Sequence, residues 1–306
     1  MFDTNPTLIQ PPTLPFPPNT LTSRTPLILI HDGGGTTFDY FFLGNIHRST
    51  YGIHNPNFLS GVPWDGGIPQ LAGLYIEFIR ALLFPKGPSP GAPSQGSGPT
   101  EIILGGWSLG GLLSLEISHQ LSLRSSDNPP LKVKGIVMID SIYPGDSSTE
   151  DRKSMKKLLP SMPVFRETCS PETKARVRRC LGLAVEMVNA WEMPRWGVKD
   201  AGPSENGTAR ASSASPPPAV LLRATEPIPV PGGEVSAEDA ESSLDVHRRS
   251  KFLGWESYGV QEGGGYDLVK AVADVPGHHF NLFQDEENAA VVTEKIRWAC
   301  DLIDRG

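Results

Sequence analysis

The sequence predicts an α/β protein with a mostly parallel, doubly wound sheet. Two observations carry this prediction: short apolar runs typical of buried strands, and intervening segments whose apolar residues recur at helical spacing. They follow one another as strand, helix, strand, helix, strand, the order that builds a parallel sheet covered by helices. The 306 residues suffice for one large domain of this class or for two small ones.

The first predicted strand and helix precede residue 85. Residues 27–30 (LILI) form an apolar run that soon meets three glycines, Gly33 to Gly35, as a buried parallel strand does when it enters a tight loop. Residues 66–84 carry apolar side chains along one face of a helix. A tract rich in Pro, Gly and Ser over residues 85–100 follows, and we expect it to be a flexible connection.

The remaining elements repeat the same alternation. A strand, a helix and a second strand follow the flexible tract directly, and two more strands and a closing helix come near the end of the chain. These elements are expected at residues 101–106, 109–123, 132–139, 219–227, 268–275 and 286–303. No internal repeat interrupts them.

We therefore expect one core domain with an insertion. Residues 1–25 are a Pro-rich extension that should lie extended on the surface, and residues 26–144 and 219–306 form the core. Residues 145–218 are predicted to be an inserted helical lid with a flexible, low-complexity end. Ser170 and Pro171 are a good cap and first-turn pair for its main helix. Its apolar stripe is Val177, Leu181, Ala184, Val188 and Trp191.

Composition excludes several classes of function. A net charge of −7 and a pI near 5.5 offer no basic patch for nucleic acid. There is no secretory signal and no run of 18 apolar residues, so we expect no membrane span. The three cysteines lack metal or redox spacing, and no H-E-x-x-H motif is present. These features predict a cytoplasmic protein without a metal or other cofactor.

Residues 101–118 (EIILGGWSLGGLLSLEIS) contain the most informative motif. Ser108 lies between glycine pairs where a predicted strand turns into a predicted helix. Such a turn exposes the serine hydroxyl, and small neighbours at Gly106 and Gly110 relieve the crowding. The pattern G-x-S-x-G also occurs at residues 87–91, but that copy lies in the flexible tract without a strand or a helix. The context therefore predicts Ser108 as a nucleophile.

Chain order supports this interpretation. A serine nucleophile needs a base, and the base needs an acid to orient it. Hydrolases of this architecture carry Ser, acid and His in that order, each after a strand. Asp140 ends the run GIVMID, and His278 and His279 follow the last predicted strand in PGHHF.

Several motifs in this order resemble the thioesterase domains of fungal polyketide synthases and nonribosomal peptide synthetases, which have the α/β-hydrolase fold. They are PLILIHDGGGT, GGIPQLAGLYIEFIRAL, GGWSLGGLLSLEI, GIVMIDSIYP, FLGWESYG and VPGHHFNLF. The lid segment SPETKARVRRCLGLAV is also similar to that of the fungal polyketide group. The resemblance covers residues 26–304. No synthase module precedes them, so we expect a free-standing enzyme that acts on a carrier protein in trans.

The resemblance distinguishes between candidate residues. In this family the acid follows the strand after the nucleophile helix, which corresponds to Asp140. Many other α/β-hydrolases carry it one strand later, which corresponds to Glu226. The family's histidine directly precedes Phe, which favours His279 over His278. Each alternative stays open on sequence grounds.

The oxyanion hole requires two N–H donors aimed at the carbonyl oxygen. One is expected from the amide of Leu109, directly after the nucleophile. The other is expected from the loop HDGGG, at Gly33 or, second, at Gly34, which we also expect to contact substrate. His31 and Asp32 in the same loop are interpreted as turn residues.

Lid residues should line an apolar tunnel for the acyl chain. The candidates are Leu158, Met162, Phe165 and Val188; an alternative is that they bury only the lid's own core.

The predicted activity is a serine thioesterase. It would release a polyketide or peptide chain from the phosphopantetheine arm of an acyl or peptidyl carrier domain, through an acyl-serine intermediate, by hydrolysis, transfer or cyclisation. Two alternatives remain: a carboxylesterase on small soluble esters, and a catalytically inactive hydrolase fold that acts as an interaction module.

Overall fold

A computed structural model describes most of the chain. The described residues are 4–12, 24–85, 99–124, 127–145, 163, 165, 167–197, 215–229, 242–260 and 266–306. Among the helices that they form, none has the length and apolar character needed to cross a lipid bilayer.

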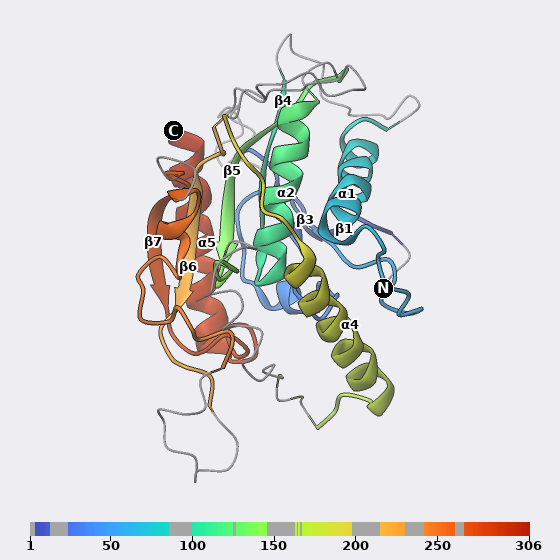
Figure 1. Ribbon diagram of the computed structural model, residues 1–306, viewed down its shortest axis with the longest axis vertical. Coiled ribbons are helices and arrows are strands. Elements are labelled where there is room, and N and C mark those ends of the chain that lie inside the picture. Colours follow the sequence, from blue (N-terminus) through green and yellow to red (C-terminus); the bar gives the residue numbers. More distant parts are fainter. Residues whose placement is uncertain are drawn as a thin grey trace.

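The described residues form a seven-stranded sheet in the order β1-β3-β2-β4-β5-β6-β7 (Figure 1). β1 pairs antiparallel with β3, and all other neighbours are parallel, as predicted for a mostly parallel sheet. The strands are β1 (Thr7–Gln10), β2 (Leu27–Ile30), β3 (Thr50–Ile53), β4 (Thr100–Trp107), β5 (Leu131–Ile139), β6 (Ala219–Ala224) and β7 (Val269–Val275).

Helices cover both faces of the sheet. The α-helices are α1 (Gly67–Leu83), α2 (Leu109–Leu123), α4 (Pro171–Ala190) and α5 (Glu286–Arg305), and the short 3-10 helices are η1 (Phe38–Phe42) and η2 (Trp255–Ser257). Apolar side chains of α1, α2 and α4 share one core cluster, whereas those of α5 belong to a second cluster. The two clusters are separated by the sheet.

Alternation along the strands divides the core between these clusters. In β2, Ile28 and Ile30 join the cluster of α1 and α2, whereas Leu27 and Leu29 join the cluster of α5. All four side chains are fully buried. Because successive side chains of a strand point to opposite faces, a strand buried on both faces is apolar throughout. This explains why LILI could be recognised as a strand.

The N-terminal region contains pairing that the sequence did not reveal. Residues 7–10 are extended, as expected, but they also add an antiparallel edge strand beside β3. The Asn5 side chain fastens this segment, since its amide donates to the His54 carbonyl at 2.8 Å and its carbonyl accepts from the His54 amide at 3.3 Å. Both β1 and β3 have only four residues, too few to show a periodicity.

The helix that the sequence predicts for the lid, α4, begins at the predicted position, and its role as a lid stays a prediction. The Ser170 hydroxyl caps α4 by accepting from the Thr173 amide at 3.1 Å, and Pro171 opens the first turn. The helix lies beyond the carboxyl ends of the central strands (Figure 1). Its C-terminal end is attached to α2, because the Trp191 indole donates to the Glu116 carboxylate at 3.0 Å and both side chains are buried.

Candidate active site

Ser108 occupies a strained turn between β4 and α2. Its backbone has φ 54° and ψ −115°, a conformation that residues with a side chain rarely adopt. Two hydrogen bonds to the end of β5 hold the turn: the Ser108 amide donates to the Ile139 carbonyl at 2.8 Å, and the Ser108 carbonyl accepts from the Ser141 hydroxyl at 2.7 Å. The sheet therefore fixes the backbone of Ser108.

Glycines make this turn possible. A Cβ atom at Gly106 would lie 2.6 Å from the Ile30 carbonyl oxygen, and one at Gly110 would overlap the same oxygen. A Cβ at Gly111 would overlap the Ser141 hydroxyl. The glycine pairs around Ser108 thus allow α2 to approach the ends of β2 and β5 more closely than any side chain permits.

The start of α2 provides donors beside Ser108. The amide of Leu109, the first residue of the helix, has no acceptor among the described residues. The 15-residue helix also directs the positive end of its dipole at this point. An anionic oxygen next to Ser108 would be stabilised by both.

Asp140 and His279 meet at the carboxyl ends of β5 and β7. The His279 Nδ1 atom lies 2.8 Å from Asp140 Oδ2, and both side chains are buried. Asp140 also has a positive φ of 45° at the end of its strand. The geometry thus joins the acid after β5 to the second histidine of PGHHF, whereas Glu226 is exposed. His278 instead accepts from the Phe280 amide through its Nδ1 atom at 3.2 Å.

The imidazole of His279 also lies close to the serine turn. Its ring centroid is 5.5 Å from that of Trp107, the residue before Ser108. Among the described residues, no hydrogen bond joins the Ser108 hydroxyl to His279. Such bonds are often long before substrate binds.

Asp140 is an ionised, buried carboxylate. Burial alone would raise the pKa of its carboxyl group, but hydrogen bonds from His279 and Arg248 outweigh that effect and lower the pKa to about 2. Arg248 donates to both carboxylate oxygens, at 2.5 Å and 2.9 Å. The acid is therefore charged throughout the neutral range.

The loop HDGGG lies beneath the lid helix. A Cβ at Gly33 would be 3.1 Å from Leu181 of α4, and one at Gly34 would be 3.3 Å from Val177. The stripe predicted on the lid thus covers the loop from which the second oxyanion donor is expected. Among the described residues, the Gly33 amide has no acceptor. The Gly34 amide lies close enough to the Asp32 carboxylate to lower its pKa, which favours Gly33 as the open donor.

Two titratable side chains begin this loop. His31 is buried, with its ring nitrogens 2.5 Å from the Asp32 carbonyl and 2.6 Å from the Tyr75 hydroxyl. Burial lowers its pKa to about 4. Burial and the nearby Asp39 raise the pKa of Asp32 to about 7, although amides of the loop oppose the shift. The Gly35 amide donates to the Asp32 carbonyl at 3.1 Å, so Asp32 opens the turn, whereas the turn role of His31 stays a prediction.

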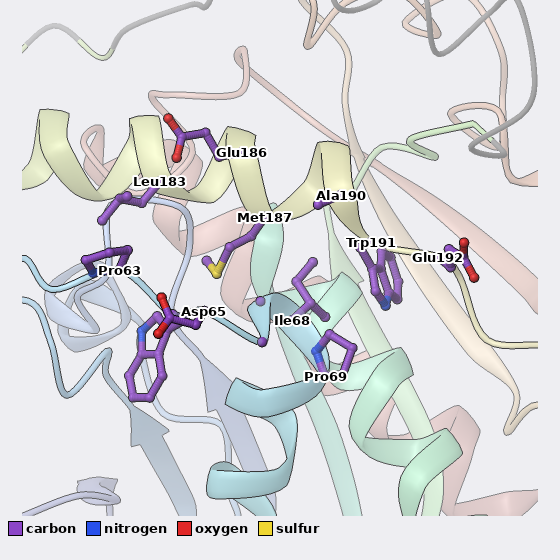
Figure 2. A pocket seen from close by; sticks show the side chains of 13 residues that line it. Pro63, Asp65, Ile68, Pro69, Leu183, Glu186, Met187, Ala190, Trp191 and Glu192 are labelled. Carbon is purple, nitrogen blue, oxygen red and sulfur yellow. The ribbon is translucent and has the colours of Figure 1, made fainter.

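A groove of about 470 Å³ runs along the lid helix (Figure 2). Its walls are formed by residues between Pro63 and Pro69, before and at the start of α1, and by residues between Leu183 and Glu192, at the end of α4 and just after it. In Figure 2, Met187 extends from α4 toward the side of Asp65, and Trp191, directly after α4, extends toward Pro69, while Glu186 points away. Ser108, Asp140 and His279 are not among its lining residues.

The predicted tunnel residues have different positions. Leu158 and Met162 lie outside the described residues. The Phe165 ring packs beneath the Arg178 guanidinium at 5.2 Å, and Val188 packs on the core cluster of α1 and α2. Neither residue lines the groove. Their role in binding substrate stays a prediction.

Sequence reasoning missed the residues that support the site. Arg248 and Asp245 lie in a region without regular secondary structure, and Glu116 reads as an ordinary polar position of α2. Hydrophobic periodicity gives no signal for buried charges. Only the spatial neighbours, which come from distant parts of the chain, reveal what these side chains do.

The sheet order and a serine on a strand-to-helix turn place the protein in the α/β-hydrolase class. No family model matches the chain. Curated relatives do match the chain. The chain is 32% identical over 308 residues to thioesterase frbE of Dothideomycetidae sp. (strain 11243), and the match covers 99% of this chain and 97% of that protein. It is also 32% identical to the probable thioesterase gloN of Glarea lozoyensis, covering 90% and 89%. The chain belongs to this family of fungal thioesterases, which confirms the resemblance seen in its motifs.

Solved structures agree on the fold. The NocB thioesterase domain from the nocardicin cluster matches with a TM-score of 0.53 at 20% identity, covering 92% of this chain and 95% of that one. YbtT, a type II thioesterase from the yersiniabactin pathway, matches with a TM-score of 0.52 at 16% identity, covering 97% and 98%. At this identity the matches support the α/β-hydrolase fold alone.

Proposed function

We propose that the protein is a serine thioesterase of secondary-metabolite biosynthesis, with Ser108, His279 and Asp140 as its catalytic residues. The observation that carries the proposal is the buried Asp140–His279 pair at the carboxyl edge of the sheet, beside the strained turn of Ser108. The names of its relatives, frbE and gloN, supply the reaction class.

The first half-reaction acylates Ser108. The Nε2 atom of His279 takes the hydroxyl proton, and the serine oxygen attacks the thioester carbonyl. Charge that develops on the carbonyl oxygen is held by the amides of Leu109 and Gly33, each contributing on the order of 3 kcal/mol to barrier reduction. The C–S bond then breaks, and the thiolate leaves with the proton from His279.

The second half-reaction releases the chain. His279 removes a proton from water, or from a hydroxyl or amine of the substrate, and the resulting nucleophile attacks the acyl-serine. Water gives a free acid, whereas an internal nucleophile gives a lactone or lactam. Asp140 keeps the Nδ1 side of the ring bonded while the ring carries charge.

The donor is a carrier-protein thioester. A polyketide synthase or nonribosomal peptide synthetase supplies such a thioester, because its growing chain is bound to the phosphopantetheine arm of a carrier domain. One curated relative, the nonribosomal peptide synthetase imqB, is 33% identical to this chain over only 8% of its own length. We propose that the present chain meets such a carrier domain as a separate partner. The reaction needs no metal or other cofactor of its own.

Labelling tests the nucleophile. A fluorophosphonate probe should form one adduct, located on Ser108 by peptide mass spectrometry, and the Ser108→Ala variant should stay unlabelled. The copy of the motif around Ser89 supplies the matched control, since Ser89→Ala should label like the unaltered protein. An unlabelled Ser108 in folded protein would identify an inactive hydrolase fold.

Substrate comparison tests the reaction class. We expect kcat/KM on an acyl-pantetheine thioester to exceed that on the nitrophenyl ester of the same acid. A clear preference for the simple ester would instead establish a carboxylesterase. Ser108→Ala should abolish both activities.

A further inference from the structure

The Asp140 carboxylate has a full set of hydrogen bonds. Oδ1 accepts from the Ala224 amide at 2.9 Å and from Arg248 at 2.5 Å, and Oδ2 accepts from Arg248 and His279 at 2.9 Å and 2.8 Å. A carboxylate offers about four lone-pair sites, so these donors occupy them all. Rotation of the carboxylate would break several bonds at once.

Arg248 is itself held from several sides. Its Nε atom donates to Asp245 at 3.0 Å, and its terminal nitrogens also reach the carbonyls of Ala224 and Leu244 at 3.0 Å and 3.3 Å. The second oxygen of Asp245 accepts from the Ile228 amide at 2.7 Å. Asp245 and Arg248 are only 5% and 9% exposed, so their charges act on one another with little screening.

The net charge of Asp140, Arg248 and Asp245 decides how strongly this cluster stabilises a protonated His279. A guanidinium bonded to both oxygens of Asp140 would by itself cancel the negative charge that stabilises a protonated His279. Asp245 restores it, because two carboxylates and one guanidinium leave a net charge of −1. The pair formed with an imidazolium is then neutral, as it would be with an isolated aspartate.

We propose that Arg248 and Asp245 form a charge-balanced clamp on Asp140: Arg248 sets the orientation of its carboxylate, and Asp245 preserves one net negative charge beside His279. Both are positioning residues, since they act through Asp140. This inference rests on the proposed function, because it assigns the clamp to the catalytic acid of that reaction.

Other charged groups near the clamp are few among the described residues. His278, next to His279, lies within electrostatic reach of Glu226, Asp245 and Arg248, and burial lowers its pKa. On its other side the His279 ring meets Trp107 and Phe280, which carry no charge. His278→Asn is therefore a necessary background for any pH measurement on the clamp.

Three variants separate orientation from charge. Asp245→Asn keeps the two hydrogen bonds from Arg248 to Asp140 but removes one negative charge. The acid-side midpoint of kcat/KM plotted against pH should therefore fall by roughly half to one pH unit. Arg248→Gln removes the positive charge and should move that midpoint upward. Arg248→Lys keeps the charge but not the two hydrogen bonds, so kcat should fall about tenfold or more while the midpoint stays within a few tenths of a unit.

The profiles are measured with an acyl-pantetheine thioester, and folding is checked by circular dichroism. A merely structural role would lower activity without opposite shifts of the midpoint. Equal midpoints in Asp245→Asn and the unaltered protein, or shifts of both charge variants in one direction, would overturn the proposal. If Arg248→Gln fails to fold, Asp245→Asn and Arg248→Lys still decide it.

A second readout does not depend on catalysis. The chemical shifts of the His279 ring are followed by NMR against pH in the His278→Asn variant. The midpoint of their change should lie at lower pH when Asp245→Asn is added to that variant. If the protein has no thioesterase activity and Ser108 is unlabelled, the proposed function fails. The NMR midpoints then still show whether the clamp sets the charge beside His279.

Discussion

The two sides of the candidate site are built in opposite ways. On the acid side, Asp140 is fully buried and each of its oxygens accepts two hydrogen bonds. On the loop side, the amides of Gly33 and Leu109 have no acceptor among the described residues, and the loop is shaped by close contacts with α4. The protein itself satisfies every polar atom of the Asp140 carboxylate, whereas it leaves the two amides that we propose as oxyanion donors unpaired.

This difference fits the roles that we propose for the two sides. A charge buried without partners is costly, so the protein must satisfy Asp140 itself. Donors for a transient oxyanion must instead stay unpaired until the reaction supplies their acceptor. The acid side is therefore sensitive to changes of charge, and the loop side to changes of volume.

The largest effect expected from a change of volume is at Gly110. A Cβ there would overlap the Ile30 carbonyl and lie 3.0 Å from that of His31, and backbone cannot move aside as a side chain can. Gly110→Ala should lower the free energy of unfolding by about 3 kcal/mol or more. Urea denaturation followed by circular dichroism measures the loss.

Gly182 supplies the matched control. It lies within α4, where an added Cβ would meet no atom within 4 Å. Gly182→Ala should stabilise the protein by roughly 0.5–1 kcal/mol, because alanine favours the helix. Equal stability of the two variants would show that the turn around Ser108 is not limited by space.

The free energy of unfolding should depend on pH through His31 and Asp32 of the HDGGG loop. The pKa of His31 is lowered to about 4 in the fold, so the unfolded chain binds more protons between pH 4 and 6.5. This group adds stability above pH 6.5, and that stability is lost on acidification toward pH 4, by roughly 3 kcal/mol. Asp32 has the opposite sign, because its raised pKa of about 7 makes stability fall as pH rises from 4 to 7.

Single variants should separate these opposing trends. In Asp32→Asn, the free energy of unfolding should rise between pH 4.5 and 6.5, since only His31 then titrates with a shift in this loop. In His31→Gln, it should fall between pH 4.5 and 7. Urea titrations at four pH values measure both slopes, and equal slopes in the two variants would contradict the assignment.

The smallest loss is expected at Gly33, where the change acts on activity rather than on stability. The methyl group of Gly33→Ala would press on Leu181 at 3.1 Å and displace the amide that we assign to the oxyanion. We expect kcat/KM to fall about tenfold with little change in thermal stability, since a displaced donor is weakened rather than lost. Leu181→Ala should restore most of the activity in the double variant. A double variant no better than Gly33→Ala would place the cause elsewhere.

Features with a local sequence pattern were predictable, whereas contacts between distant residues were not. Strands buried on both faces and a glycine-flanked serine leave strong local patterns, so β2, β4 and β5 and the turn at Ser108 were predicted. The pairing of Asp140 with His279 spans 139 residues, and only chain order and family resemblance indicated it. Arg248 and Asp245 follow no period, because their positions are decided by charges brought together in space.

One contact between helices has a practical consequence. α2 begins directly after Ser108 and, further along, carries the Glu116 carboxylate that accepts a hydrogen bond from the Trp191 indole. Helix α2 thus sets the distance between Ser108 and the end of α4. If α4 were replaced by the corresponding helix of a related enzyme, the new helix would need an indole at the position of Trp191 to bond Glu116, or α2 would have to be replaced with it.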